Sequence, residues 1–242
     1  MPARSALRIR EVTDPDDPVL SAFGKLQRAI YFEPDALIPG SMLGWLLQQQ
    51  SGARANFMLV AEDGDELLGG TVFHYLASAG SGFSSFMGVA RAHRGQRIAR
   101  RLHEARFATL DRAAGGHVAG VFIDVVNPTR LTPAELEREA RVGSDPMARR
   151  RVFEHLGFRQ VDIRYEQPVG GPHGGPVTNM DLLFCPRESS DTVPTELVLA
   201  TMRAYWSPWL GQRADRHVAE LEARAAGRTI LALVSPVPDG RQ

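Results

Sequence analysis

The pattern of apolar and polar side chains along the N-terminal half predicts strands and helices in alternation. Residues 7–12 alternate apolar and polar side chains, as a half-buried strand does. Apolar runs predict three further strands over residues 56–62, 66–76 and 82–90. The turn Asp63-Gly64-Asp65 favours a hairpin between the first two of these runs. Two helices are predicted over residues 17–31 and 41–50, the second of which has apolar side chains at helical spacing.

The C-terminal half continues this alternation. Five helices are predicted, over residues 98–114, 133–141, 146–156, 195–205 and 213–226. Four strands are predicted, over residues 120–126, 158–167, 177–185 and 229–234. Asp145 is placed to cap the helix that starts at Pro146, and Gly157 is placed to end it. This order of elements predicts an α/β (α+β) fold, in which a mixed sheet is flanked by helices.

Two segments interrupt this pattern. The polar stretch 186–194 looks like a linker, so we expect a domain over residues 1–187 and a helical extension over 188–242 that ends in a strand-like run. A charged insertion over residues 128–144 forms either a lid or substrate wall, or a surface excursion. The extension contains an aromatic and apolar cluster: Tyr205, Trp206, Trp209 and Leu210. We expect this cluster to pack the extension or to form a homodimer contact, rather than to bind a ligand.

Composition excludes several classes of protein. The chain has 28 lysines and arginines against 28 aspartates and glutamates, and this neutral balance argues against binding nucleic acid. The chain has neither a signal-peptide core nor an apolar run of membrane-spanning length, so we expect a cytoplasmic protein with no membrane partner. Cys185 is the single cysteine, which excludes an internal disulfide, and we expect it to be a buried, inert thiol. Histidines and acids lack metal-ligand spacing, so we expect no metal.

The junction between the predicted strand 82–90 and helix 98–114 is the strongest candidate for a binding site. Met87, Gly88 and Val89 lead into the turn 94–99, after which the helix begins. A helix N-terminus presents unpaired N–H groups and the positive end of its dipole, and small residues let an anion approach them. These features fit a phosphate site, but an ordinary connection with solvated arginines fits them equally well.

Motifs at this junction resemble the acyl-CoA-binding motif of the GNAT acetyltransferase superfamily. Five residues lie at the family positions and spacing: Val89, Arg94, Gly95, Ile98 and Ala99. A second family signature, an aromatic residue followed four positions later by Gly-Phe, is matched by Phe153, Gly157 and Phe158. The order of predicted elements agrees with the family over roughly residues 5–187. The resemblance implies a mostly antiparallel central sheet and acetyl-CoA as co-substrate.

The resemblance also assigns roles to individual residues. It implies that main-chain groups of Met87, Gly88 and Val89 pair with the pantetheine arm of acetyl-CoA, which enters where strands 82–90 and 120–126 splay apart. It further implies a pyrophosphate cradle at the turn, made with Arg94 and by these main-chain amides: Gly95, Gln96, Arg97, Ile98, Ala99 and Arg100.

Two residues depart from the family pattern. Arg97 occupies the position of the middle glycine of the turn, where a side chain is tolerated if the residue keeps a helical φ. Its guanidinium is able to pair with a phosphate. Phe153 replaces the tyrosine that commonly protonates the leaving thiolate, so no general acid can be carried over to this position.

Candidates for the remaining catalytic groups are few. Asp124 and Asn127 lie on or just after the predicted strand 120–126, and we name both as catalytic candidates. The alternative roles are a strand-end hydrogen bond for one and a turn cap for the other. His74 and Tyr75 alternate on one strand, so only one of them can face the cleft, and either is otherwise a packed side chain.

The leading functional hypothesis is an acetyl-CoA-dependent N-acetyltransferase that transfers acetyl directly to a small-molecule amine. The alternative is a GNAT-fold protein that binds CoA with weak or no catalysis and serves as a sensor or interaction module. A third possibility is that Arg97 blocks acyl-CoA and that the cleft takes another ligand.

Overall fold

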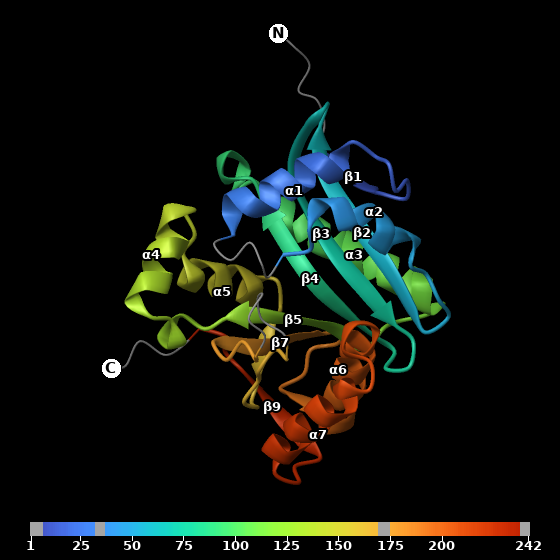
Figure 1. Ribbon diagram of the computed structural model, residues 1–242, viewed down its shortest axis with the longest axis vertical. Coiled ribbons are helices and arrows are strands. Elements are labelled where there is room, and N and C mark those ends of the chain that lie inside the picture. The colour runs from blue at the N-terminus through green and yellow to red at the C-terminus, as the bar shows by residue number, and fades with distance from the viewer. Residues whose placement is uncertain (1–6, 32–36, 169–174, 238–242) are drawn as a thin grey trace.

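A computed structural model describes residues 7–31, 37–168 and 175–237 (Figure 1). The strands of this part of the chain are β1 (Arg8–Glu11), β2 (Arg54–Asp63), β3 (Glu66–Leu76), β4 (Ser81–Val89), β5 (Gly120–Val126), β6 (Arg159–Val161), β7 (Met180–Pro186), β8 (Thr192–Pro194) and β9 (Ile230–Val234). Its α-helices are α1 (Val19–Ile30), α2 (Gly40–Gln48), α3 (Ile98–Ala114), α4 (Pro133–Arg141), α5 (Pro146–His155), α6 (Thr195–Leu210) and α7 (Arg213–Ala225). The strands form one sheet in the order β1-β2-β3-β4-β5-β7-β6-β9-β8.

The sheet is mixed and mostly antiparallel, with helices on both faces, as the sequence predicted. Alternate residues of β2 show the two faces: Leu59 packs in the core that includes α3, whereas Met58 and Val60 pack in the core that includes α1. In Figure 1, α1 and α2 lie in front of the sheet and α3 lies behind it. None of the described helices has the length and apolar character needed to cross a membrane.

Most predicted elements are confirmed, and the largest differences occur in three places. The predicted helix 195–205 continues to Leu210 through Pro208, and its added residues Trp206 and Leu210 are buried. The predicted strand 158–167 is only three residues long. The linker 186–194 contains the strand β8. The predicted cap at α5 is confirmed, since Asp145 accepts hydrogen bonds from the amides of Met147 and Ala148.

The last strand of the extension belongs to the main sheet. β9 pairs with β6 through Val161 and Leu233, and with β8 through Val193 and Leu231. Side chains of α6, α7 and β9 share one apolar core with β5 and β7. The strand-like run 229–234 therefore finds its sheet edge within the same chain.

Two irregularities of β4 shape the centre of the sheet. β4 and β5 run parallel but pair only at Gly82–Val121 and Phe83–Phe122, and beyond this point they diverge. On its other edge, β4 carries a β-bulge: Phe73 pairs with Ser84 and Val72 pairs with Phe86, so the intervening Ser85 has no partner. A bulge redirects side chains locally and is common beside active sites.

Candidate active site

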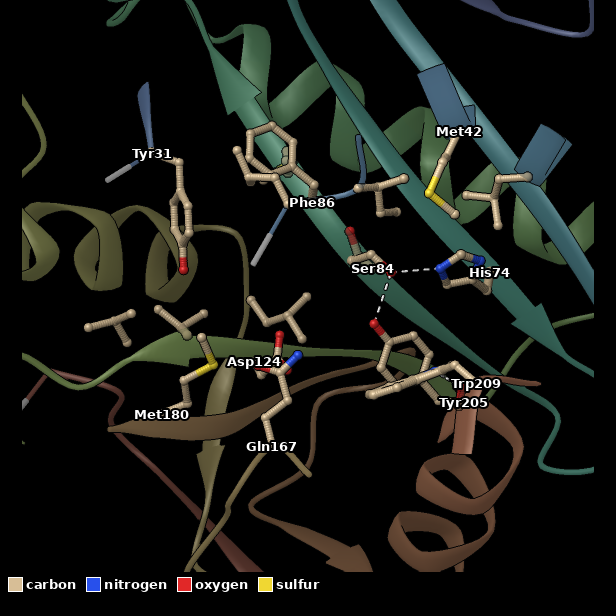
Figure 2. Close-up of a pocket in the computed structure, with 18 of the residues that line it drawn as sticks. Tyr31, Met42, His74, Ser84, Phe86, Asp124, Gln167, Met180, Tyr205 and Trp209 are labelled. Carbon is tan, nitrogen blue, oxygen red and sulfur yellow. Dashed lines mark hydrogen bonds between the residues drawn. The ribbon is translucent and has the colours of Figure 1, made fainter. Parts of the chain in front are cut away.

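A cavity of about 600 Å³ lies where β4 and β5 separate (Figure 2). Its walls include residues 84–87 of β4 and residues 123–126 of β5. Side chains from α2 and α6 complete it, among them Trp45 and Trp209. The divergence of two parallel strands therefore opens directly into a cavity of the size that small-molecule sites have.

The turn before α3 keeps the backbone of a glycine-type turn despite Arg97. Gly95 has φ +80° and Arg97 has φ +61°, both in the left-handed region. The helical φ under which a side chain at position 97 would be tolerated without strain is therefore not adopted. Ile98 starts α3 without a side-chain cap, so its first amides remain available to an anion.

Arginines concentrate positive charge at this turn. The guanidinium of Arg94 donates to the carbonyl of Gly143 (3.2 Å), and its pKa is lowered by burial and by the neighbouring Arg91 and Arg149. Gly143 belongs to the insertion 128–144, which therefore contacts the turn, while none of its described residues lines the cavity. Several cations close together favour binding of an anion.

The two catalytic candidates, one on β5 and one just after it, have different surroundings. Asp124 lines the cavity and accepts a hydrogen bond from Tyr165 Oη (3.1 Å), and burial raises its pKa to about 6. Asn127 does not line the cavity. Its Nδ2 donates to Asp181 (2.8 Å) and its Oδ1 accepts from the amide of Thr129 (3.0 Å), which is the turn-cap role.

A hydrogen-bonded chain crosses the floor of the cavity (Figure 2). Asn56 Oδ1 lies 2.7 Å from His74 Nδ1, Ser85 Oγ lies 2.6 Å from His74 Nε2, and Tyr205 Oη lies 3.1 Å from Ser85 Oγ. Because Asn56 Oδ1 only accepts, Nδ1 of His74 carries the proton, and Nε2 accepts from Ser85. Burial lowers the pKa of His74 well below its usual value, so the imidazole is neutral. Tyr205 then donates to Ser85.

Ser85, Tyr205 and Trp209 are cavity residues that the sequence did not indicate. Of the alternating pair, His74 lines the cavity and Tyr75 packs in the core with α3. Trp206 is buried, in agreement with the predicted packing role of the aromatic cluster. Tyr205 also packs in the core that contains Trp206, and both Tyr205 and Trp209 line the cavity, so whether these two residues contact a ligand stays untested.

Two further residues match their predicted character. Phe153 lines the cavity with an edge-to-face contact to Phe158, and it has no hydroxyl to donate. Cys185 is buried, and burial raises the pKa of its thiol to about 11, so the thiolate form is disfavoured. Over the described ranges, no group of three or more histidine, cysteine or acidic side chains is placed to hold a metal ion.

Comparison with known proteins gives the fold. No family model and no curated protein matches the sequence. Among solved structures, Ard1 from Thermoplasma volcanium is similar with a TM-score of 0.51 and 14% identity, covering 76% of this chain and 99% of that one. A putative GNAT acetyltransferase from Bacteroides thetaiotaomicron is similar with a TM-score of 0.50 and 14% identity, covering 91% of this chain and 99% of that one. The chain has the GNAT fold. Arabidopsis thaliana NAA60, solved in complex with acetyl-CoA, also matches (0.50, 14%, covering 76% and 100%).

Proposed function

We propose that the protein is an N-acetyltransferase that binds acetyl-CoA along the open edge of β4 and acetylates a small-molecule amine in the cavity. The observation that carries this proposal is the divergence of β4 and β5 after Phe83–Phe122, which opens the strand edge directly into the cavity. Acetyl-CoA supplies the acetyl group as an activated thioester when bound. The GNAT fold and the structure of NAA60 with acetyl-CoA support this choice of co-substrate.

The residues present fit a nucleotide co-substrate. Met87, Gly88 and Val89 lie on β4 beyond its last pair with β5, so this edge has main-chain groups to offer the pantetheine arm. At the turn, a Cβ built on Gly95 meets no heavy atom within 4 Å, which leaves room for a phosphate beside the first amides of α3. Arg94 and Arg97 add positive charge there.

Asp124 is the group we assign to proton removal. An alkylammonium ion must lose a proton before its nitrogen can attack a thioester. A carboxylate with a pKa of about 6 is mostly ionised at pH 7 to 8, so Asp124 is able to accept that proton inside the cavity. We assign no general acid to position 153, because Phe153 carries no exchangeable proton.

A thermal-shift titration with acetyl-CoA, CoA and ATP tests the binding step. We expect acetyl-CoA and CoA to raise the melting temperature by mass action, and ATP to have a smaller effect. We expect Gly95→Val to weaken acetyl-CoA binding at least tenfold. Gly80→Val is the matched control, because Gly80 also has a positive φ (+58°) and open space around it but lies at the far end of β4. Absence of any shift with millimolar acetyl-CoA would refute the proposal.

A thiol-release assay with a panel of amines then tests the chemistry. Amine-dependent release of CoA supports an acetyltransferase. Binding of acetyl-CoA without release on any amine supports a CoA-binding sensor, which Phe153 at the cavity wall favours as the second candidate.

A further inference from the structure

The cavity contains two charged side chains of opposite sign that form no ion pair with a described residue. Arg54 donates from Nε to Asn56 Oδ1 (2.9 Å) and from Nη1 to the carbonyl of Tyr205 (3.1 Å), and both acceptors are neutral. Asp124 accepts from the neutral hydroxyl of Tyr165. A partly buried charge without a counterion is costly, so the two charges indicate partners that bind from outside.

The other charged residue of the cavity wall shows the contrast. Arg149 also lines the cavity, but both of its terminal nitrogens reach Glu139, at 3.1 and 2.9 Å. Burial lowers the pKa of Arg54 and raises that of Asp124, so the surroundings disfavour the charged form of both side chains. Arg54 therefore faces the cavity with an uncompensated positive charge, and Asp124 with an uncompensated negative one.

The hydrogen-bonded chain at the floor of the cavity carries no charge. His74 is neutral, Ser85 Oγ donates a hydrogen bond to it, and Tyr205 Oη donates to Ser85. The phenol of Tyr205 responds to both neighbours, since Asp124 raises its pKa and Arg54 lowers it. Among the described residues of the cavity, the polar pattern is thus one cation and one anion without an ion-pair partner, and a neutral hydroxyl chain near both.

Exposed apolar side chains line the same cavity. Trp45 is 56% exposed, Met42 is 47% exposed and Trp209 is 37% exposed. Met42 and Trp209 lie on the side of the cavity that holds His74 (Figure 2). Large apolar side chains that converge on a cavity while open to solvent favour contact with an apolar part of a ligand.

We propose that the acceptor is a zwitterion with an apolar body, namely an amino acid with a large apolar side chain. Its carboxylate pairs with Arg54, its amine lies at Asp124, and its side chain packs against Trp45 and Trp209. A bidentate pair with a carboxylate suits the planar guanidinium of Arg54. This assignment rests on the proposed function, because it names the substrate class of the same site.

Isothermal titration of the CoA-saturated protein tests the proposal through binding alone. The probes are L-phenylalanine, L-leucine, L-phenylalaninamide, phenethylamine, 3-phenylpropanoate and glycine. We expect L-phenylalanine or L-leucine to bind at least tenfold more tightly than each analogue that lacks the carboxylate, the amine or the side chain. Equal affinity for L-phenylalanine and phenethylamine overturns the proposal, and so does failure of both amino acids to bind.

Failure of the proposed function is recognised separately. The same titrations are repeated without CoA, so the preference among the probes is measured even if no CoA binds. Binding of acetyl-CoA without selection of the zwitterion refutes only the acceptor class, whereas absence of acetyl-CoA binding refutes the proposed function.

Variants at Arg54 test the residue itself. We expect Arg54→Gln to lower the affinity for the preferred amino acid at least tenfold and to abolish the preference for L-phenylalanine over its amide. Arg54→Lys retains the charge and should restore much of that preference. Unchanged discrimination in Arg54→Gln overturns the assignment. Thermal unfolding confirms that each variant folds, and the wild-type probe series remains decisive if one does not.

The apolar contact has its own matched pair. We expect Trp45→Ala to weaken binding of the preferred amino acid at least fivefold. Ile230→Ala removes a comparably exposed apolar side chain (58%) that does not line the cavity, and should leave binding unchanged. Equal affinity of both variants would refute the role of Trp45.

Discussion

Two residues of the candidate site, Arg97 and Asp124, are expected to destabilise the folded state. Arg97 has a left-handed backbone conformation, which residues other than glycine, asparagine and aspartate seldom adopt. Asp124 is a carboxylate in an environment that disfavours its charge. Strain and unfavourable burial often persist where function requires them. Both residues therefore predict measurable effects on stability.

Replacing Arg97 with glycine should stabilise the protein. A non-glycine residue in the left-handed region costs about 1 kcal/mol, partly offset by the greater entropy of unfolded glycine. We expect Arg97→Gly to raise the free energy of unfolding in urea by about 0.5 kcal/mol. Glu104→Gly, at an exposed position inside α3, is the control and should lower it by about 1 kcal/mol. If the free energy of unfolding fell by a similar amount in both variants, the left-handed backbone of Arg97 would not be destabilising.

Asp124 should make both stability and rate depend on pH. The pKa of Asp124 is raised to about 6 in the folded state, so between about pH 4 and 6 the folded protein holds a proton that the unfolded chain has lost. The free energy of unfolding therefore falls as pH rises through this range, and above it the ionised side chain opposes folding. We expect Asp124→Asn to raise the free energy of unfolding at pH 8 by about 3 kcal/mol, since the pKa of Asp124 lies about two units above its ordinary value of 3.8 and one unit corresponds to about 1.4 kcal/mol.

The acetylation rate should respond in the opposite sense. We expect the wild-type rate to fall as pH drops through about 6, where Asp124 becomes protonated. The Asp124→Asn variant should be slow, and its rate should not fall in this way over the same pH range. The control is Asp162→Asn, because Asp162 is exposed and pairs with Arg228. If Asp124→Asn kept the wild-type rate and the same fall in rate at low pH, another group would have to accept the proton.

At the scale of elements, irregular strands and short helices place the site. The bulge on β4 leaves Ser85 unpaired, and its side chain reaches His74 of the neighbouring strand. α2 brings Met42 and Trp45 to the cavity, and its position depends on a close backbone contact. A Cβ built on Gly44 lies 2.3 Å from the carbonyl oxygen of Pro15.

Gly44→Ala should displace α2 without harming the nucleotide site. Neither backbone can yield cheaply, so we expect a loss of about 1–3 kcal/mol in the free energy of unfolding and weaker binding of amine acceptors. Acetyl-CoA affinity should stay within twofold, because β4 and α3 are untouched. Gly52→Ala is the control, since a Cβ there meets nothing within 4 Å. Equal stability of the two variants would disprove the contact.

At the scale of the whole molecule, the extension completes both the sheet and the cavity. β9 pairs with β6, and α6 contributes Tyr205 and Trp209 to the cavity wall. Core residues of α6 pack against strands of the preceding region, so both parts share one apolar core. A homodimer contact, one of the two alternatives given by the sequence for the aromatic cluster, stays a prediction.

Truncation after residue 187 should abolish cooperative folding. Removing α6, α7 and β9 exposes a face of the sheet that holds buried residues such as Phe122, Leu182 and Phe184. We expect the fragment 1–187 to aggregate or to unfold without a sharp thermal transition. A fragment with a sharp transition and a melting temperature within a few degrees of the full chain would show that residues 1–187 are an independent domain.

The sequence by itself determined the features that depend on neighbouring residues. Periodicity located most helices and strands, Asp145 and Gly157 marked the ends of α5, and the turn before α3 followed from the local order of residues. The GNAT fold followed from two short motifs together with that order.

Only the tertiary structure decided how the cavity is built. Ser85 and Tyr205 are 120 positions apart, and Arg54 and Tyr205 are 151 apart, so no local pattern records their contact. The bulge, the separation of Asp124 from Asn127 and the pKa of Asp124 depend likewise on neighbours distant in the chain. Burial and hydrogen-bond partners set the chemistry of a side chain, and folding alone supplies them.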